Sequence, residues 1–161
     1  ATNNRGCTAR KVKDQIDDAL ARGATAVVGG GVEGRFVSPT ILTGVTPDMK
    51  VYCEETFGPV VPVIPFRTDE EAIAIANDTE YGLSSGVITR DENRGLAIAE
   101  RLETGMCHIN CSPVNDEPHA PFGGVKSSGV GRYGGRWAME NFTETRWITM
   151  DRGGRPYPPV F

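Results

Sequence analysis

The chain has 161 residues, which suffices for one domain with a hydrophobic core and is too short for two domains of ordinary size. Its 39% hydrophobic and 24% charged residues indicate a globular protein, and a net charge of -4 without a basic cluster argues against nucleic-acid binding. No apolar run approaches the length of a transmembrane helix, and residues 1–9 lack a signal-peptide pattern. We therefore expect a cytoplasmic protein whose 4 cysteines are free thiols.

The first part of the chain predicts a helix followed by short extended segments. Within residues 8–21, apolar side chains recur at helical spacing and define one buried face, formed by Val12, Ile16, Ala19 and Leu20. Gly23 supplies a suitable stop after this helix. Residues 24–28 and 36–42 are predicted to be extended, and Pro39 predicts that the second of these is an edge strand.

The middle of the chain alternates between strands and helices. The predicted strands cover residues 60–66, 85–89 and 106–110. The predicted helices cover residues 70–77, after a capping box formed by Thr68 and Glu71, and 92–103, after a cap at Asp91. This alternation predicts an α/β fold with a parallel or mostly parallel sheet and crossover helices.

The last part of the chain is less regular. Residues 111–135 are rich in Pro, Gly and Ser, and a loop of that length is typically functional. A helical turn is predicted over residues 136–141, and the β-branched and aromatic residues 142–150 predict a strand. We divide the chain into two parts. The main portion covers residues 1–139, and a short C-terminal strand with an irregular tail covers residues 140–161.

Residues 54–60, with the sequence EETFGPV, contain the most unusual feature of the chain. Glu54 and Glu55 stand beside Phe57, immediately before a Gly-Pro break and an apolar strand. Strand ends in α/β proteins bind ligands, and a carboxylate next to an aromatic ring suits a ribose with an attached ring. The alternative is a solvated turn with Phe57 in the core.

Two glycine patterns match G-x-G-x-x-G without the context of a dinucleotide-binding loop, which follows a strand and opens a helix. The first pattern precedes an extended segment, and the second follows a loop. We reject both patterns, which consist of Gly29, Gly31 and Gly34 and of Gly129, Gly131 and Gly134.

The cysteines and histidines indicate neither a metal site nor a nucleophile. Cys107 and His108 point to opposite faces of a strand, and Cys107 lies ~13 Å from Cys111 in an extended chain. Cys7 lacks a nearby base, although it precedes a helix, and the carboxylates beside Cys53 disfavour a thiolate. We predict no bound metal.

Several segments together resemble the C-terminal part of NAD(P)-dependent aldehyde dehydrogenases. They are GRFVSPTIL at residues 34–42, EETFGPVVPVIPF at 54–66, ANDTEYGLSSGVITRD at 76–91, GMCHIN at 105–110 and APFGGVKSSGVGRYGG at 120–135. The E-x-F-G-P and P-F-G-G-x-K-x-S-G motifs are specific, and the resemblance covers nearly the whole chain.

The resemblance implies a division of roles among residues. Glu55 would accept hydrogen bonds from the ribose hydroxyls of NAD or NADP, and Phe57 would pack near the nicotinamide. Residues 142–150 would form an oligomerisation strand in a homo-oligomer, a dimer or a tetramer. The loop of residues 111–122 would line the aldehyde tunnel, with Cys111, Ser112, Val114 and Phe122 as tunnel residues.

The resemblance also implies that the catalytic cysteine, the general-base glutamate and the Rossmann-type cofactor domain precede residue 1. We therefore expect an incomplete enzyme that is inactive by itself. Many family members carry a glutamate where this sequence has Tyr133. Tyr133 and the run DEP at residues 116–118 resemble vanillin, benzaldehyde and salicylaldehyde dehydrogenases, which suggests an aromatic aldehyde. The alternative function is a stand-alone binding or assembly module without catalysis.

Overall fold

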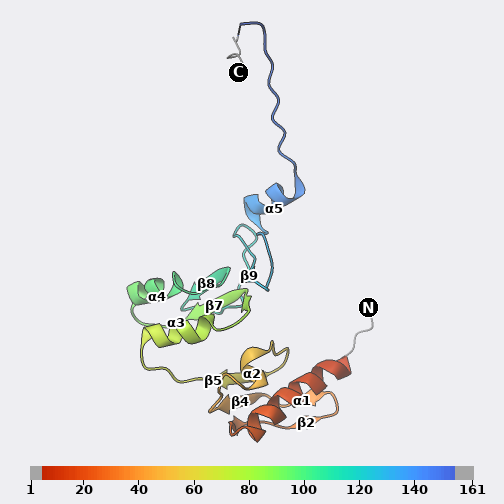
Figure 1. The fold of residues 1–161 in the computed structure, drawn as a ribbon, viewed down its shortest axis with the longest axis vertical. Coiled ribbons are helices and arrows are strands. Elements are labelled where there is room, and N and C mark those ends of the chain that lie inside the picture. Colours follow the sequence, from red (N-terminus) through yellow and green to blue (C-terminus); the bar gives the residue numbers. More distant parts are fainter. Residues whose placement is uncertain (1–4, 155–161) are drawn as a thin grey trace, which may run out of the picture. The chain divides into compact units, whose positions relative to one another are not determined.

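The computed structural model describes residues 5–154, with side chains from Thr8 onward. The side chain of Cys7, predicted to be a free thiol, therefore lies outside the described residues, as do the last residues of the predicted tail. The chain forms two compact units, Ala1–Thr79 and Glu80–Phe161 (Figure 1). We describe each unit by itself.

The first unit combines a long helix with a three-stranded sheet. Its helices are α1 (Arg5–Ala21), α2 (Lys50–Cys53) and α3 (Asp69–Asn77), and its strands are β1 (Thr25–Val28), β2 (Val32–Glu33), β3 (Phe36–Val37), β4 (Thr40–Thr43) and β5 (Val60–Val63). The sheet has the order β1-β4-β5, in which β4 runs antiparallel to β1 and parallel to β5. β2 and β3 form a separate antiparallel pair.

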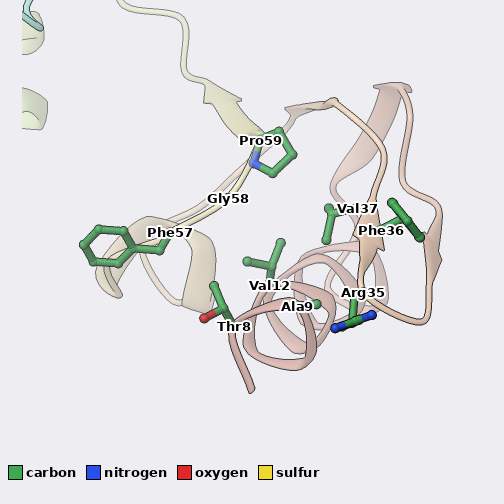
Figure 2. A pocket seen from close by; sticks show the side chains of 9 residues that line it. All are labelled: Thr8, Ala9, Val12, Arg35, Phe36, Val37, Phe57, Gly58 and Pro59. Carbon is green, nitrogen blue, oxygen red and sulfur yellow. The ribbon is translucent and has the colours of Figure 1, made fainter. Parts of the chain in front are cut away.

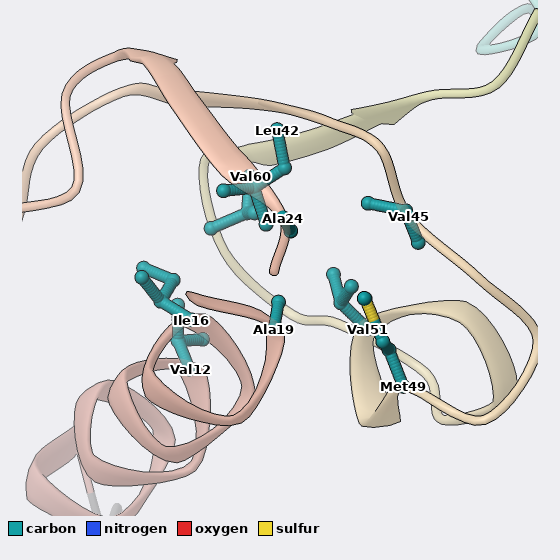
Figure 3. Packing of buried hydrophobic residues seen from close by; sticks show 9 residues of the cluster. All are labelled: Val12, Ile16, Ala19, Ala24, Leu42, Val45, Met49, Val51 and Val60. Carbon is teal, nitrogen blue, oxygen red and sulfur yellow. The ribbon is translucent and has the colours of Figure 1, made fainter. Parts of the chain in front are cut away.

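One face of α1 packs on this sheet and forms the core of the first unit. The predicted core positions Val12, Ile16 and Ala19 are at most 1% exposed and pack with Leu42 of β4. Figure 3 shows these residues facing one another across the space between helix and sheet. The fourth predicted position, Leu20, is 40% exposed, because the helix ends one residue later and its last turn lies at the margin of the core.

β4 is the central strand, so the prediction of an edge strand over residues 36–42 was wrong. Pro39 lies between β3 and β4 and therefore removes no hydrogen bond from the ladder. The amide of the next residue, Thr40, donates to the Pro59 carbonyl oxygen at 2.8 Å, which begins the parallel pairing with β5.

The second unit is built around a parallel strand pair joined by a helix. Its elements are β6 (Tyr81–Gly82), β7 (Ser84–Val87), α4 (Glu92–Ala99), β8 (Met106–Ile109), β9 (Val125–Lys126) and α5 (Gly135–Phe142). β7 pairs in parallel with β8 from Ser84↔Met106 to Val87↔Ile109, and α4 forms the crossover. β6 pairs antiparallel with β9. The α/β class, with parallel pairs and a crossover helix, is confirmed, although the strands belong to separate small sheets.

The predicted helix starts are confirmed by their caps. Thr68 Oγ1 accepts a hydrogen bond from the Glu71 amide at 3.2 Å, and Asp91 Oδ1 accepts one from the Arg94 amide at 3.1 Å. α4 is shorter than predicted, because the amides of Arg101 and Leu102 donate to the third preceding carbonyl, Ile98 and Ala99, and so form a tighter turn after the helix.

Within the single chain, the described residues after α5 form no strand, so the strand over residues 142–150, which would pair with a neighbouring copy, stays a prediction. Phe142 is the last residue of α5, and no other segment of the described chain pairs with residues 143–154. Trp147 and Ile148 are 88% and 76% exposed. The expected boundary at residues 139 and 140 falls inside α5. Among the described helices, none has the length and apolar character needed to cross a membrane.

Candidate functional site

The segment of residues 54–59, which contains Glu55 and Phe57, connects α2 to β5 and lies against α1. Gln15 of α1 is only 1% exposed and binds this segment through both atoms of its amide. Its Nε2 donates to the Glu55 carbonyl oxygen at 3.3 Å, and its Oε1 accepts from Thr56 Oγ1 at 3.0 Å. The backbone at Glu55 is thus fixed to the helix.

Gly58 brings the same segment into direct contact with α1. A Cβ added at Gly58 would lie 2.7 Å from Val12 Cγ2, closer than real Cβ contacts. Only a glycine therefore fits here without movement. The next residue, Pro59, accepts the hydrogen bond from Thr40 that joins the segment to β4.

The helix that leads into the segment, α2, is attached to α1 by charged groups. Asp18 Oδ2 accepts from the Lys50 amide at 2.9 Å, and Asp18 Oδ1 accepts from Arg22 Nε at 3.0 Å. Both hydrogen bonds lower the pKa of Asp18, and the bond from the Lys50 amide has the larger effect. Arg22, the residue after α1, also donates from its Nη1 to Asp48 Oδ2 at 2.8 Å, so the C-terminal end of α1 contacts both sides of the α2 start.

The far end of α2 is attached to the C-terminal end of α3. Tyr52 OH donates to Asp78 Oδ2 at 2.7 Å. Partial burial, as the larger cause, and the hydrogen bond to the Asp78 carboxylate, as the smaller one, raise the pKa of Tyr52 to about 12. The candidate segment therefore begins at a helix fixed at both ends.

The candidate side chains, Glu55 and Phe57, point away from these attachments. Glu55 is exposed, and within the described chain its carboxylate has no hydrogen-bond or ion-pair partner. Phe57 is 71% exposed, so its ring does not lie in the core, contrary to what the alternative of a solvated turn expected. Glu54, by contrast, lies 3.8 Å from Lys11 Nζ. An unpaired carboxylate and an exposed ring two residues apart can bind a polar group and an attached flat group.

A cavity of about 430 Å³ adjoins the segment (Figure 2). Phe57, Gly58 and Pro59 form one side of it, and Arg35 from the turn between β2 and β3 lies on another, with Val12 and Ala9 of α1 between them. Most of the described lining residues are of apolar types, and Arg35 carries the one formal charge among them.

The predicted tunnel residues lie in the second unit and do not gather in one place. Cys111, Ser112 and Val114 are exposed on the loop after β8, and Ser112 Oγ accepts from the Val114 amide at 3.1 Å. Phe122 is half-buried and exchanges backbone hydrogen bonds of 2.9 Å and 2.7 Å with Tyr133. Of the four, only Phe122 lines a second cavity of about 180 Å³, together with His108.

Asn110 connects β8 to this loop. It has a left-handed backbone, with φ at 56°, and its Oδ1 accepts from the Thr89 amide at 2.8 Å. Asn110 thereby fixes the direction in which the loop leaves the parallel pair.

The described cysteine and histidine side chains do not form a common cluster. Cys53, Cys107 and Cys111 are free thiols. In the part of the chain that the structure describes, no three His, Cys, Asp or Glu side chains gather to hold a metal ion. His108 Nε2 is buried without a hydrogen-bond partner there.

Gln15 is the residue of this site that the sequence analysis missed. Its position lies on the apolar face of α1, next to Ile16 and three residues after Val12. A polar residue at such a position was the available signal, because a buried amide requires hydrogen-bond partners.

Comparisons with known proteins agree with the motifs. The sequence profile described as the aldehyde dehydrogenase family matches residues 5–148. A vanillin dehydrogenase from Pseudomonas fluorescens is 49% identical over 148 residues, which are 92% of this chain and 31% of that protein.

Two solved structures are also similar. A salicylaldehyde dehydrogenase from Pseudomonas putida G7, complexed with salicylaldehyde, has a TM-score of 0.90 at 44% identity, over 95% of this chain and 32% of that one. An aldehyde dehydrogenase from Mycobacterium tuberculosis, complexed with NAD+, has a TM-score of 0.86 at 37% identity, over 94% of this chain and 32% of that one. The chain thus spans about a third of the length of these relatives. Because the family profile matches most of its length, the chain belongs to the aldehyde dehydrogenase family.

Proposed function

We propose that this chain is the C-terminal part of an NAD(P)-dependent aldehyde dehydrogenase that oxidises an aromatic aldehyde to a carboxylate. Family membership and the exposed pair Glu55 and Phe57 support this function. The aromatic substrate is supported by the vanillin and salicylaldehyde dehydrogenases among the relatives.

Glu55 and Phe57 contribute to cofactor binding in this proposal. The Glu55 carboxylate accepts hydrogen bonds from the nicotinamide ribose, and the Phe57 ring packs beside the nicotinamide. When bound, NAD or NADP supplies the hydride acceptor for aldehyde oxidation. The observation that carries the assignment is the unpaired, exposed carboxylate two residues from an exposed ring on a backbone fixed by Gln15. Such pre-organisation keeps the ordering cost on ligand binding low.

The loop of residues 111–122 is proposed to line the aldehyde tunnel through Cys111, Ser112, Val114 and Phe122. Phe122 is supported by its place in the smaller cavity. The other three residues are exposed in this chain, where they are available to a further wall of the tunnel.

The chain by itself is proposed to be inactive, because none of its described cysteines stands in the context expected of the nucleophile. Cys53 and Cys111 are exposed, and Cys107 lies within β8. Turnover of NAD+ or NADP+ by the purified 161-residue chain with vanillin would contradict this part of the proposal.

Residues 143–150 are proposed to pair with a sheet of a second copy in a homo-oligomer. The exposed Trp147 and Ile148 and the absence of a partner segment within the described chain support this role. Replacing both residues with lysine should lower the oligomer mass of the full-length protein in light scattering. An unchanged mass would contradict it.

The decisive experiment uses the protein encoded by the full reading frame that contains this chain. We expect reduction of NAD+ or NADP+ with vanillin, benzaldehyde and salicylaldehyde, at higher kcat/KM than with acetaldehyde. Glu55→Gln should lower the rate of hydride transfer by ten- to a hundred-fold, while the adjacent control Glu54→Gln should not. Equal kinetics of Glu55→Gln and the wild type would contradict the role of Glu55. Lack of aldehyde oxidation would contradict the whole proposal.

A further inference from the structure

Gln15 is a buried amide in the middle of an otherwise apolar helix face. It is 1% exposed and is surrounded along α1 by Val12, Ile16 and Ala19, which are equally buried. A leucine would fit this face at no cost in hydrogen bonding, whereas a buried amide is destabilising unless its polar atoms find partners. Both polar atoms of Gln15 do so, and both partners belong to the segment of Glu55 and Thr56.

These two hydrogen bonds determine which side chains of the segment face outward. Thr56 turns its hydroxyl toward α1 and is half-buried, while Glu55 and Phe57 on either side of it are exposed. In an extended chain, neighbouring side chains point to opposite sides. Holding Thr56 inward therefore directs Glu55 and Phe57 outward together.

A second contact fixes the other end of the segment but does not replace this one. Gly58 rests on Val12, and Pro59 is bonded to Thr40, so the chain is held from Gly58 onward. At Glu55 itself, the one side chain of the described residues that donates to the backbone oxygen is Gln15. Without it, residues 54–56 would be attached at α2, at Gly58 and through the exposed ion pair of Glu54 with Lys11.

We propose that Gln15 is a positioning residue for cofactor binding, which acts by fixing the Glu55 backbone and the Thr56 hydroxyl so that Glu55 and Phe57 face the ligand. This inference rests on the proposed function. Gln15 touches no ligand itself, and its effect passes through the two hydrogen bonds. The ligand concerned is a dinucleotide with a ribose diol and an attached ring.

The test compares variants of the full-length enzyme in titrations with NAD+ and with NADP+. Gln15→Leu keeps much of the side-chain volume and removes both hydrogen bonds, so we expect the Kd of the cofactor to rise about tenfold. Thr56→Val removes one hydrogen bond and should weaken binding several-fold, whereas Thr56→Ser keeps the hydroxyl and should restore it. The KM for the aldehyde should stay unchanged in all three.

Ile73→Val is the control for loss of stability alone. Ile73 is buried in α3 of the same unit and is 6% exposed, and it belongs to neither the cavity nor the segment. This variant should lower the melting temperature and leave the cofactor Kd unchanged. If Gln15→Leu behaves in the same way, the inference is overturned, since Gln15 then supports only the fold.

The outcomes separate this inference from the proposed function. Weak cofactor binding in Glu55→Gln with normal binding in Gln15→Leu would overturn the positioning role and leave the proposed function intact. Normal cofactor binding together with a normal rate of hydride transfer in Glu55→Gln as well would overturn the cofactor role of the segment. If Gln15→Leu does not fold, the pair Thr56→Val and Thr56→Ser decides, because equal cofactor Kd values for the two would overturn the inference.

Discussion

The close approach of Gly58 to α1 gives the sharpest quantitative prediction. In Gly58→Ala, the new Cβ would stand 2.7 Å from Val12 Cγ2 and 3.2 Å from Val12 Cγ1, whereas ordinary contact begins at 3.4 Å. Val12 is 1% exposed, and a helical valine has one strongly preferred rotamer, so a change of rotamer does not relieve the contact. Overpacking of this kind costs roughly 1–3 kcal/mol. The lower chain entropy of alanine in the unfolded state offsets about 0.4–1 kcal/mol of it.

Val12→Ala provides the matched partner for a double-mutant cycle. Alone, it removes two buried methyl groups and should destabilise the chain by roughly 1.5–3 kcal/mol. It also leaves the new Cβ at position 58 with a contact of 3.5 Å to the Val12 Cβ, which is an ordinary distance. The double variant should therefore be more stable than the sum of the single effects predicts, by about 1 kcal/mol or more.

Urea unfolding followed by circular dichroism measures the cycle on the wild type, both single variants and the double variant of the 161-residue chain. Additive effects within about 0.3 kcal/mol would refute the close contact between segment and helix. A Gly58→Ala variant as stable as the wild type would refute it directly.

Three further predictions concern the frame around the site. Leu42→Ala, at a central-strand position that is 0% exposed, should lower the free energy of unfolding by about 2–5 kcal/mol in the same urea assay. Asp91→Ala, which leaves the Arg94 amide without its cap, should cost about 1 kcal/mol, whereas Asp91→Asn should cost less. The pKa of Tyr52 is raised to about 12 from an ordinary 10.0, so the folded state favours the protonated phenol. The stability that this preference contributes is fully present below pH 10 and is lost as the pH rises toward 12. The free energy of unfolding of Tyr52→Phe should lack this part of the decline at alkaline pH. Identical pH profiles of the variant and the wild type would contradict the effect of partial burial and of the hydrogen bond to Asp78 on the Tyr52 hydroxyl.

Local chemistry explains which parts of the fold were predictable. The starts of α3 and α4 depend on Thr68 and Asp91, whose side chains cap amides three residues away. Even here the details differ, because the Glu71 carboxylate accepts from the Arg67 amide at 2.8 Å and not from the Thr68 amide that a capping box would use.

Strand pairing depends on distant segments and was less predictable. The sequence predicts extended residues near Pro39, but only the chain's path shows that β4 begins after the proline and becomes central. Residues 142–150 have strand-forming side chains, yet a strand also needs a neighbour, and none of the described segments pairs with residues 143–154. Propensity therefore identified extended chain better than it identified sheets.

The site shows the same division between local and distant information. The sequence singled out Glu55 and Phe57 because a carboxylate and an aromatic ring directly before a strand have no packing role there. In the structure, both side chains are exposed. Gln15 lies 40 residues earlier in the chain than Glu55, and nothing near it in sequence identifies its partners. A glutamine on an apolar helix face indicates that both polar atoms of its amide need hydrogen-bond partners, but only the packing of α1 against the segment identifies these partners. The residues proposed to contact a ligand could thus be identified from their neighbours in the sequence, whereas the residue proposed to position them could be identified only from the fold.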